Sequence, residues 1–393
     1  MPSPIKVGIV RRAGFAVAAT AGPLGLAYRF ALAYRVRAGY PRRNPPLITP
    51  TDLGLPYETT VVESDGMRLP AWFIPARDGL PGPGVVLVHG WESARDRTLP
   101  MAVFLHAAGF HCLTFDVRAH GSNPPEALPL TGGEFGRDAE AAFATLMRRP
   151  EVTAGAISGH SMGAIGAILA AAADPRVAGL VATSAPADPY RLTRQTFRLA
   201  HLPIPDAIAY PLAWLTTRVY LRPRGHSVRD VSASAAIARY AGPVLLVHGD
   251  LDPVVPVSHL QRLAEAVRNA RLGDPDAASV ETMVIAGGEH SWLYEIADYR
   301  RAVARMLTVA CGGPLDPDEA GRIAAATPAR RIPDAETRFA AMEERYGGLR
   351  TLAQVALPGG TRRRVDDDPQ TQPGPSSADT GQPAAASGLA VEP

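Results

Sequence analysis

A serine at the apex of a predicted strand–turn–helix unit constrains this chain more than any other feature. The apolar run Val152–Ile157 predicts a strand that leads into the pattern Gly159-x-Ser161-x-Gly163, and the run Ala164–Ala173 predicts a helix leading out. Small residues on both sides let strand and helix pass closely, and the tight turn holds the hydroxyl clear of the backbone. Because a helix N-terminus favours negative charge beside it, we expect Ser161 to be a nucleophile.

Strand-like and helix-like runs alternate along the chain on both sides of this serine. Strands are predicted at 59–63, 70–74, 84–89, 112–116, 152–158, 178–183, 244–248 and 280–286. Helices are predicted at 95–108, 134–148, 162–173, 258–269 and 292–309. The first two strands favour an antiparallel hairpin, and several others are almost wholly apolar, as in parallel strands covered on both faces. The sequence therefore predicts an α/β sheet of about eight strands with helices on both sides.

Composition divides the chain into four parts. Residues 1–56 form a basic, partly apolar segment followed by a proline-rich linker, and residues 57–311 carry the strand–helix alternation. An insertion at about 186–238 is too short for a domain and predicts a small helical lid, whose aromatics either line an acyl pocket or only pack the lid. Residues 312–357 predict a C-terminal helical extension, and 358–393, poor in large apolar residues, predict a disordered tail.

The N-terminal segment is basic, although the whole chain carries a net charge of only +2, which gives no indication of nucleic-acid binding. Residues 1–51 hold eight cations and no acid. The apolar stretch 13–28 is 16 residues long, whereas a spanning helix needs about 20. Three alternatives remain open: membrane association, a secretory signal, or a helix packed on the domain. We expect a cytoplasmic protein, with the membrane surface as the alternative partner of this segment.

Cofactor and metal motifs are absent from the sequence. Cys112 and Cys311 are the only cysteines, too few for a disulfide framework in a chain of this length. No HExxH, CxxC, P-loop or GxGxxG pattern occurs. We therefore expect no metal ion and no bound cofactor, with chemistry carried by side chains alone.

A serine nucleophile requires a general base and a carboxylate that orients it, because its hydroxyl is protonated at neutral pH. Asp250 and Asp252 follow the apolar run Val244–Val247, and the carboxyl end of such a strand faces the active site. We choose Asp252 as the orienting acid and keep Asp250 as the alternative. His290, on a glycine-flanked loop 38 residues beyond Asp252, completes the order Ser, Asp, His and is the predicted base.

The same chemistry requires backbone N–H groups that meet the negative charge developing on the substrate carbonyl oxygen. The residue after the nucleophile, Met162, supplies one predicted donor. The loop after the third strand reads His89-Gly90-Trp91, in which glycine allows close approach and Trp91 supplies the second donor. We therefore expect an oxyanion hole formed by the N–H groups of Trp91 and Met162.

Five motifs in this order resemble those of the α/β-hydrolase superfamily, most closely its esterase, lysophospholipase and serine aminopeptidase-like group. They are HGW at 89–91, FDVRAHGSN at 115–123, GHSMG at 159–163, VLLVHGDLDPVVP at 244–256 and GGEHSW at 287–292. The resemblance covers about 57–310. It implies the α/β-hydrolase fold, an eight-stranded, mostly parallel sheet flanked by helices, and a triad matching Ser161, Asp252 and His290. It also implies that Asp116 and Arg118 brace the loops beside the oxyanion hole, and it assigns no role to His120.

The expected function is a serine hydrolase that cleaves small-molecule carboxylic esters through an acyl-enzyme on Ser161. An Asp nucleophile, as in related dehalogenases and epoxide hydrolases, is disfavoured because position 161 is serine. Two alternatives remain. An acyltransferase or peptidase would use the same triad with another acceptor or leaving group, and a binding module on this fold would use no triad.

Overall fold

The computed structural model describes residues 22–332, and the statements below refer to that part of the chain. The predicted tail at 358–393, the part of the predicted C-terminal extension 312–357 that follows residue 332, and the first part of the apolar stretch 13–28 lie outside the described residues.

A single sheet of eight strands runs through the described residues. The strands are β1 (Glu58–Ser64), β2 (Met67–Ile74), β3 (Gly82–Val88), β4 (His111–Phe115), β5 (Val152–His160), β6 (Val177–Thr183), β7 (Val244–Gly249) and β8 (Val280–Ile285). Their order across the sheet is β1-β2-β4-β3-β5-β6-β7-β8. β2 pairs antiparallel with β1 and β4, and every other pairing is parallel, so the predicted hairpin and parallel sheet are confirmed.

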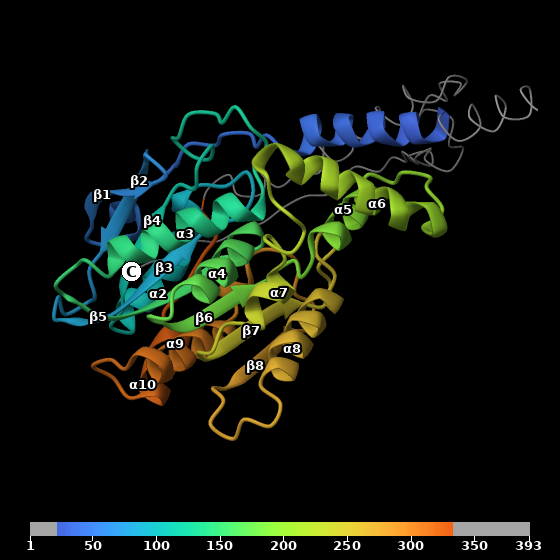
Figure 1. Ribbon diagram of the computed structural model, residues 1–393. Helices are drawn as coiled ribbons and strands as arrows, with labels where there is room; N and C mark the ends of the chain where they lie inside the picture. Colours follow the sequence, from blue (N-terminus) through green and yellow to red (C-terminus); the bar gives the residue numbers. More distant parts are fainter. Residues whose placement is uncertain (1–21, 333–393) are drawn as a thin grey trace, which may run out of the picture. The chain divides into compact units, whose positions relative to one another are not determined.

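Helices cover both faces of this sheet (Figure 1). They are α2 (Leu99–Ala107), α3 (Gly132–Leu146), α4 (Met162–Ala173), α5 (Pro189–Leu199), α6 (Asp206–Leu221), α7 (Ala233–Ile237), α8 (Ser258–Ala270), α9 (Ala297–Cys311) and α10 (Pro317–Ala326). Short 3₁₀ turns are η1 (Pro50–Leu53), η2 (Arg95–Thr98), η3 (Arg222–Arg224) and η4 (Leu293–Glu295). α3, α4, α7 and α8 pack on one face, and α2, α9 and α10 pack on the other.

The alternation of side chains along β3 explains why two cores form. Val86 and Val88 point into the core under α3 and α4, whereas Val85 and Leu87 point into the core under α2 and α9. All four side chains are buried, as expected for a strand that is covered on both faces. Because β3, β5, β7 and β8 run in parallel, the loops at their carboxyl ends gather at one edge of the sheet, where the predicted site residues lie.

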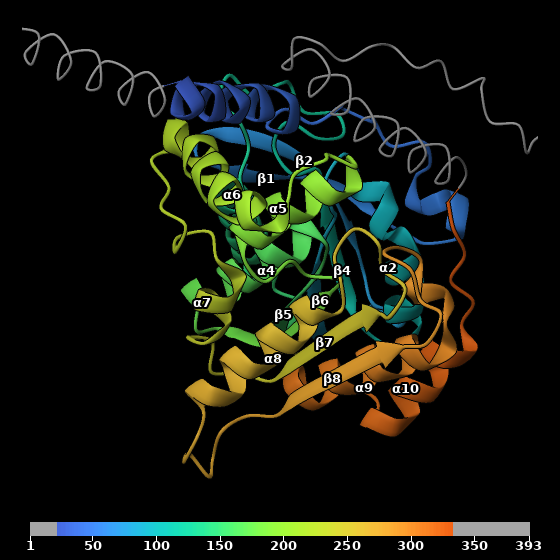
Figure 2. The same cartoon turned by 90° about the vertical axis from the view of Figure 1, so that its right-hand side faces the viewer.

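The predicted lid is helical and consists of α5 and α6 (Figure 2), whereas α7, at the end of the same insertion, packs on the sheet face beside α4 and α8. Residues 22–38 are also helical, and they pack against α5 and α6 through a small apolar cluster around Tyr34, Phe197 and Ala213. This part of the N-terminal segment therefore follows the packed-helix alternative. None of the helices among residues 22–332 is long and apolar enough to cross a bilayer.

Candidate active site

Ser161 lies on a strained turn between β5 and α4. Its backbone has a φ of 54° and a ψ of −120°, which is a region that residues with a side chain rarely adopt. The Ser161 N–H donates to the Thr183 carbonyl at the end of β6, with a distance of 3.0 Å. Strand pairing and the α4 helix thus hold the serine in the strained conformation, as the sequence pattern predicts.

The two glycines of the pattern are required by backbone contacts. A Cβ at Gly159 would lie 2.3 Å from the Gly163 carbonyl oxygen, inside the turn itself. A Cβ at Gly163 would lie 2.3 Å from the carbonyl oxygen of Val88 in β3. Neither backbone atom can move away without shifting a strand or helix, so the turn admits no side chain at these positions.

The structure brings Ser161, His290 and Asp252 into one hydrogen-bonded chain. The Ser161 Oγ lies 3.0 Å from the His290 Nε2, and the His290 Nδ1 lies 2.7 Å from the Asp252 Oδ2. All three residues are buried. With a proton on Nδ1, the imidazole donates to the carboxylate and presents an unprotonated Nε2 to the serine hydroxyl, which is the arrangement of a nucleophile, a base and an orienting acid.

The Asp252 carboxylate is fully buried and has several donors around it. Its Oδ1 accepts from the N–H groups of Val254 and Val255, at 2.9 and 2.8 Å. His248 Nε2, which donates to the Val255 carbonyl at 2.6 Å, also lies 3.3 Å from the Asp252 Oδ2. Burial acts to raise the pKa of Asp252, but the hydrogen bonds from His248 and His290 outweigh it and hold this pKa well below its ordinary value.

Asp250, the alternative acid, has a different partner. Its Oδ1 accepts from the Gly287 N–H at 2.7 Å, on the loop that leads from β8 to His290. Of the two carboxylates, Asp252 is therefore the one in contact with the imidazole, and Asp250 supports the backbone of the loop.

The predicted oxyanion loop lies against the nucleophile. A Cβ at Gly90 would be 3.4 Å from the Ser161 Cβ, and both Trp91 and Met162 line the cavity that contains Ser161. Two hydrogen bonds of the His89 ring stabilise this loop. Its Nδ1 donates to the Gly90 carbonyl at 2.8 Å, and its Nε2 accepts from the Val117 N–H at 3.0 Å. The loop after β3 is thus tied to the loop after β4.

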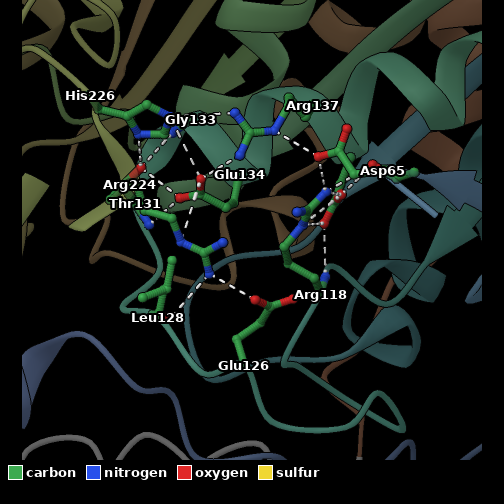
Figure 3. Close-up of polar contacts among 12 residues, drawn as sticks. Asp65, Arg118, Glu126, Leu128, Thr131, Gly133, Glu134, Arg137, Arg224 and His226 are labelled. Carbon is green, nitrogen blue, oxygen red and sulfur yellow. Dashed lines mark hydrogen bonds and ion pairs between the residues drawn. The ribbon is translucent and has the colours of Figure 1, made fainter. Parts of the chain in front are cut away.

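Asp116 and Arg118 brace neighbouring loops, as the resemblance implies. The Asp116 carboxylate accepts from the backbone N–H and the guanidinium of Arg95 in η2. Arg118 forms a buried ion pair with Asp138 of α3 at 2.6 Å. Arg118 also forms an ion pair with Asp65 in the β1–β2 turn at 2.9 Å (Figure 3). The loop after β4 is therefore held to both α3 and the antiparallel hairpin.

A second polar cluster in Figure 3 ties the start of α3 to the chain that leaves the lid. The Thr131 hydroxyl donates to the Glu134 carboxylate at 2.7 Å, and His226, after α6, lies 2.8 Å from the same hydroxyl. Arg137 donates to Glu134 at 2.6 Å, and Arg224 lies 3.8 Å from it. This cluster therefore connects the start of α3 with the segment that follows the lid helix α6.

Two positioning residues were not predicted from the sequence. The carbonyl oxygen of His290 accepts from the His160 Nε2 at 2.7 Å and from the Ser184 hydroxyl at 3.1 Å. His160 precedes the nucleophile, and Ser184 follows β6 with a φ of 51°. The backbone of the proposed base is thus fixed by two donors from neighbouring strands. The position of His160 beside Ser161 was a usable signal, whereas nothing in the sequence around Ser184 indicates this contact.

Buried histidines surround the site in the neutral form. Burial lowers the pKa of His89 and His259 to about 4 and that of His120 and His160 to about 3. His120 packs between Trp91 and the α3 side chain of Phe135, with 5.3 Å between ring centroids in both cases. A neutral imidazole supports apolar walls without adding charge, so His120 has a packing role behind the oxyanion loop.

The site opens into a cavity of about 230 Å³ beneath the lid. Much of its wall is apolar, including Ile165, Leu192, Leu221, Val231 and Val254. Within residues 22–332, no group of three or more His, Cys, Asp or Glu side chains is arranged to hold a metal ion.

A strained serine turn after a central parallel strand, with its histidine and acid on later loops and a helical lid above, defines an α/β-hydrolase. The model of the alpha/beta hydrolase family matches residues 85–306, which is more than half of the chain. The chain belongs to this family, so the predicted family and fold class are confirmed.

The chain is also similar to individual proteins and to solved structures. An uncharacterised protein of Mycobacterium tuberculosis is 32% identical over 212 residues, which cover 53% of this chain and 66% of that protein, just under two thirds of its length. A polyketide transferase of Stachybotrys chlorohalonatus is 31% identical over 126 residues, which cover 30% of this chain and 41% of the relative. Among solved structures, an esterase of Pyrococcus furiosus is 22% identical with a TM-score of 0.49, covering 64% of this chain and 89% of the esterase.

Proposed function

We propose that this protein is a serine hydrolase that cleaves carboxylic esters of small molecules through an acyl-enzyme intermediate. The observation that carries the proposal is the chain of contacts from Ser161 through His290 to Asp252, with distances of 3.0 and 2.7 Å. A hydroxyl, an imidazole and a buried carboxylate in this order are the parts that nucleophilic acyl transfer requires.

In the proposed acylation step, the Ser161 oxygen attacks the ester carbonyl carbon while the His290 Nε2 takes the hydroxyl proton. The carbonyl oxygen becomes an oxyanion, and the N–H groups of Trp91 and Met162 donate to it. The tetrahedral intermediate then expels the alcohol, which receives the proton from His290. Asp252 stabilises the imidazolium and keeps the proton on Nδ1 throughout.

In the proposed deacylation step, water takes the place of the departed alcohol. His290 removes a proton from this water, whose oxygen attacks the acyl carbon and forms a second oxyanion in the same hole. Collapse of that intermediate breaks the bond to the Ser161 oxygen and returns the proton to it. The acid leaves, and the enzyme regains its starting state.

Transfer of the acyl group to another acceptor is the second candidate function. The polyketide transferase relative, 31% identical over 126 residues, favours keeping this candidate, and a peptidase would use the same residues on an amide. Product analysis in the presence of excess alcohol distinguishes acyl transfer from hydrolysis. An ester product indicates transfer, and a free acid indicates hydrolysis.

A fluorophosphonate probe tests the proposal directly, because it reacts with an activated serine. We expect the wild-type protein to be labelled and the Ser161→Ala variant to remain unlabelled. Absence of labelling in a folded wild type, or equal labelling of both proteins, would contradict the serine mechanism and favour a binding module on this fold.

For the location of the protein, we propose the cytoplasm, with contact to a membrane surface through the basic N-terminal segment. Support comes from the eight cations of residues 1–51 and from Leu24, Leu26 and Tyr28, whose side chains are exposed. Flotation with vesicles containing anionic lipid tests this, and a Leu24→Asp and Leu26→Asp double variant should float less than the wild type. Equal flotation of the two proteins would show that Leu24 and Leu26 do not contribute to membrane binding.

A further inference from the structure

The helical residues 22–38 are built into the lid by an aromatic cluster. Tyr34 is buried, and its ring meets Phe197 of α5 at 5.8 Å and Tyr220 of α6 at 6.1 Å, both in edge-on contacts. Phe30, one turn earlier, meets the same Phe197 ring at 5.4 Å. Edge-on aromatic pairs of this kind add specific geometry to the apolar contact. One face of the N-terminal helix is therefore fixed on both lid helices.

Polar contacts fix the rotation of this helix. The Tyr34 hydroxyl lies 2.9 Å from the Thr196 hydroxyl of α5, so the tyrosine is satisfied although it is buried. The Tyr220 hydroxyl lies 3.3 Å from the Ala38 carbonyl at the end of the helix. The Gly39 carbonyl then accepts from the Leu130 N–H at 2.8 Å, just before α3. The helix thus has one defined position on the lid and on the segment before α3.

The same helix reaches the active-site cavity. Tyr34 and Ala38 line the cavity that contains Ser161, together with residues of both lid helices such as Leu192 and Leu221. The cavity wall is thus formed by three separate parts of the chain, namely the hydrolase body, the lid and residues 34–38.

The segment after this helix contacts the oxyanion loop. The Arg42 N–H donates to the Glu92 carboxylate at 3.0 Å, and the Asn44 side chain donates to the Glu92 carbonyl at 2.7 Å. Glu92 directly follows Trp91 and has a φ of 52°, a conformation that needs support from its surroundings. The region predicted as a linker therefore holds the loop on which the Trp91 donor is placed.

We propose that residues 34–38 form the far wall of the acyl pocket and that Tyr34 sets the length of the acyl chain accepted by the enzyme. This inference rests on the proposed ester hydrolysis, because it assigns the cavity to the acyl group of the ester. An apolar cavity of roughly 150 Å³ holds one benzene ring, so about 230 Å³ accommodates an acyl chain of roughly nine carbons. The substrate class is an ester of a medium-length, apolar carboxylic acid.

Two substitutions should move the chain-length preference in opposite directions. Tyr34→Ala removes a ring from the wall of the pocket, so longer chains should fit. Ala38→Leu adds three carbon atoms to the wall, so shorter chains should be favoured. One methylene in an apolar pocket is worth roughly tenfold or more in kcat/KM, so the ratio of long-chain to short-chain kcat/KM should change by at least about tenfold in each variant.

Two matched control variants distinguish a change in the pocket wall from a general effect of mutating the N-terminal helix. Tyr28→Ala removes a tyrosine from the same helix, but that side chain is exposed, so the preference should stay at the wild-type value. Tyr34→Phe keeps the ring and removes only the hydroxyl that contacts Thr196, and it should also keep the wild-type preference. A thermal unfolding curve for each variant verifies that it is folded.

The assay is hydrolysis of p-nitrophenyl esters from acetyl to palmitoyl, with kcat/KM measured for each. Opposite shifts in Tyr34→Ala and Ala38→Leu, with Tyr28→Ala unchanged, support the proposal. Unchanged preference in a folded Ala38→Leu variant overturns it, even where Tyr34→Ala does not fold. Failure of the proposed function itself would be seen separately, as absence of hydrolysis and of probe labelling in wild type. In that case, the increase in melting temperature produced by free fatty acids of each length still tests the pocket wall with the same variants.

Discussion

Exchange of Asp252 for asparagine tests the proposed catalytic apparatus at its most buried atom. The substitution keeps the shape of the side chain and removes its charge. The Oδ1 atom accepts from two backbone N–H groups, those of Val254 and Val255, and the Oδ2 atom faces His290 at 2.7 Å. The amide oxygen should take the Oδ1 position, because the flipped amide would leave two buried N–H donors without an acceptor, at about 1–3 kcal/mol each.

The amide nitrogen of the introduced asparagine would then face the His290 Nδ1, and both cannot donate. His290 is forced into the other tautomer, with its proton on Nε2, where it meets the Ser161 hydroxyl and cannot act as a base. A wrong tautomer of this kind lowers kcat by about 10⁴, equivalent to roughly 5 kcal/mol of transition-state stabilisation. The assay is hydrolysis of a short p-nitrophenyl ester at saturating substrate.

Asp250→Asn is the matched control. This carboxylate accepts from the Gly287 N–H at 2.7 Å, and an amide oxygen can accept the same hydrogen bond. We expect a loss of less than about tenfold, because a neutral acceptor replaces a charged one at the edge of the loop. If Asp252→Asn retains activity within about tenfold of wild type, or if Asp250→Asn loses as much, the assignment of the orienting acid is wrong.

Three further predictions concern stability. Gly163→Ala places a Cβ 2.3 Å from the Val88 carbonyl oxygen, so we expect loss of probe labelling and a lower melting temperature, and wild-type values for both would contradict the steric argument. Arg118→Ala leaves the buried Asp138 carboxylate without its ion-pair partner and should destabilise the fold by about 3–5 kcal/mol in urea unfolding, whereas Arg322→Ala on the exposed face of α10 should leave the midpoint unchanged. The four buried histidines around the site have pKa values of about 3 to 4 in the fold and near 6.5 in the unfolded chain, so the unfolded state binds more protons below pH 6.5. The free energy of unfolding is therefore highest above pH 6.5 and decreases as the pH falls, by about 2 kcal/mol per histidine at pH 5. A free energy of unfolding that stays constant from pH 7 to pH 5 would refute this prediction.

The strand runs and the serine turn were predictable because their causes are local. Central strands such as β3 and β7 are continuous apolar runs, and the turn at Ser161 needs glycines at fixed spacing for contacts within and beside the turn. The family motifs at 89–91, 159–163 and 287–292 carried the candidate nucleophile, base and oxyanion donors. These features place chemistry at the ends of parallel strands, so the order of strands in the sequence was sufficient to indicate the site.

The contacts that complete the candidate site depend on distant parts of the chain. From the sequence, either Asp250 or Asp252 could be the acid that orients the histidine. Only the packing of the loops shows that the Asp252 carboxylate contacts His290. Ser184 holds the His290 carbonyl across 106 residues of sequence, a contact with no local pattern.

The N-terminal segment shows most clearly the difference between what the sequence predicts and what the tertiary contacts decide. Its composition fits a membrane anchor, a signal or a packed helix, because each requires a similar run of apolar residues. The aromatic partners of Tyr34 lie on α5 and α6, far along the chain, and the cavity is formed only when those helices meet it. The sequence alone determined the sheet and the reactive turn, since these follow from local periodicity and sterics. Tertiary structure decided how the pocket is closed, since that depends on which apolar surfaces meet.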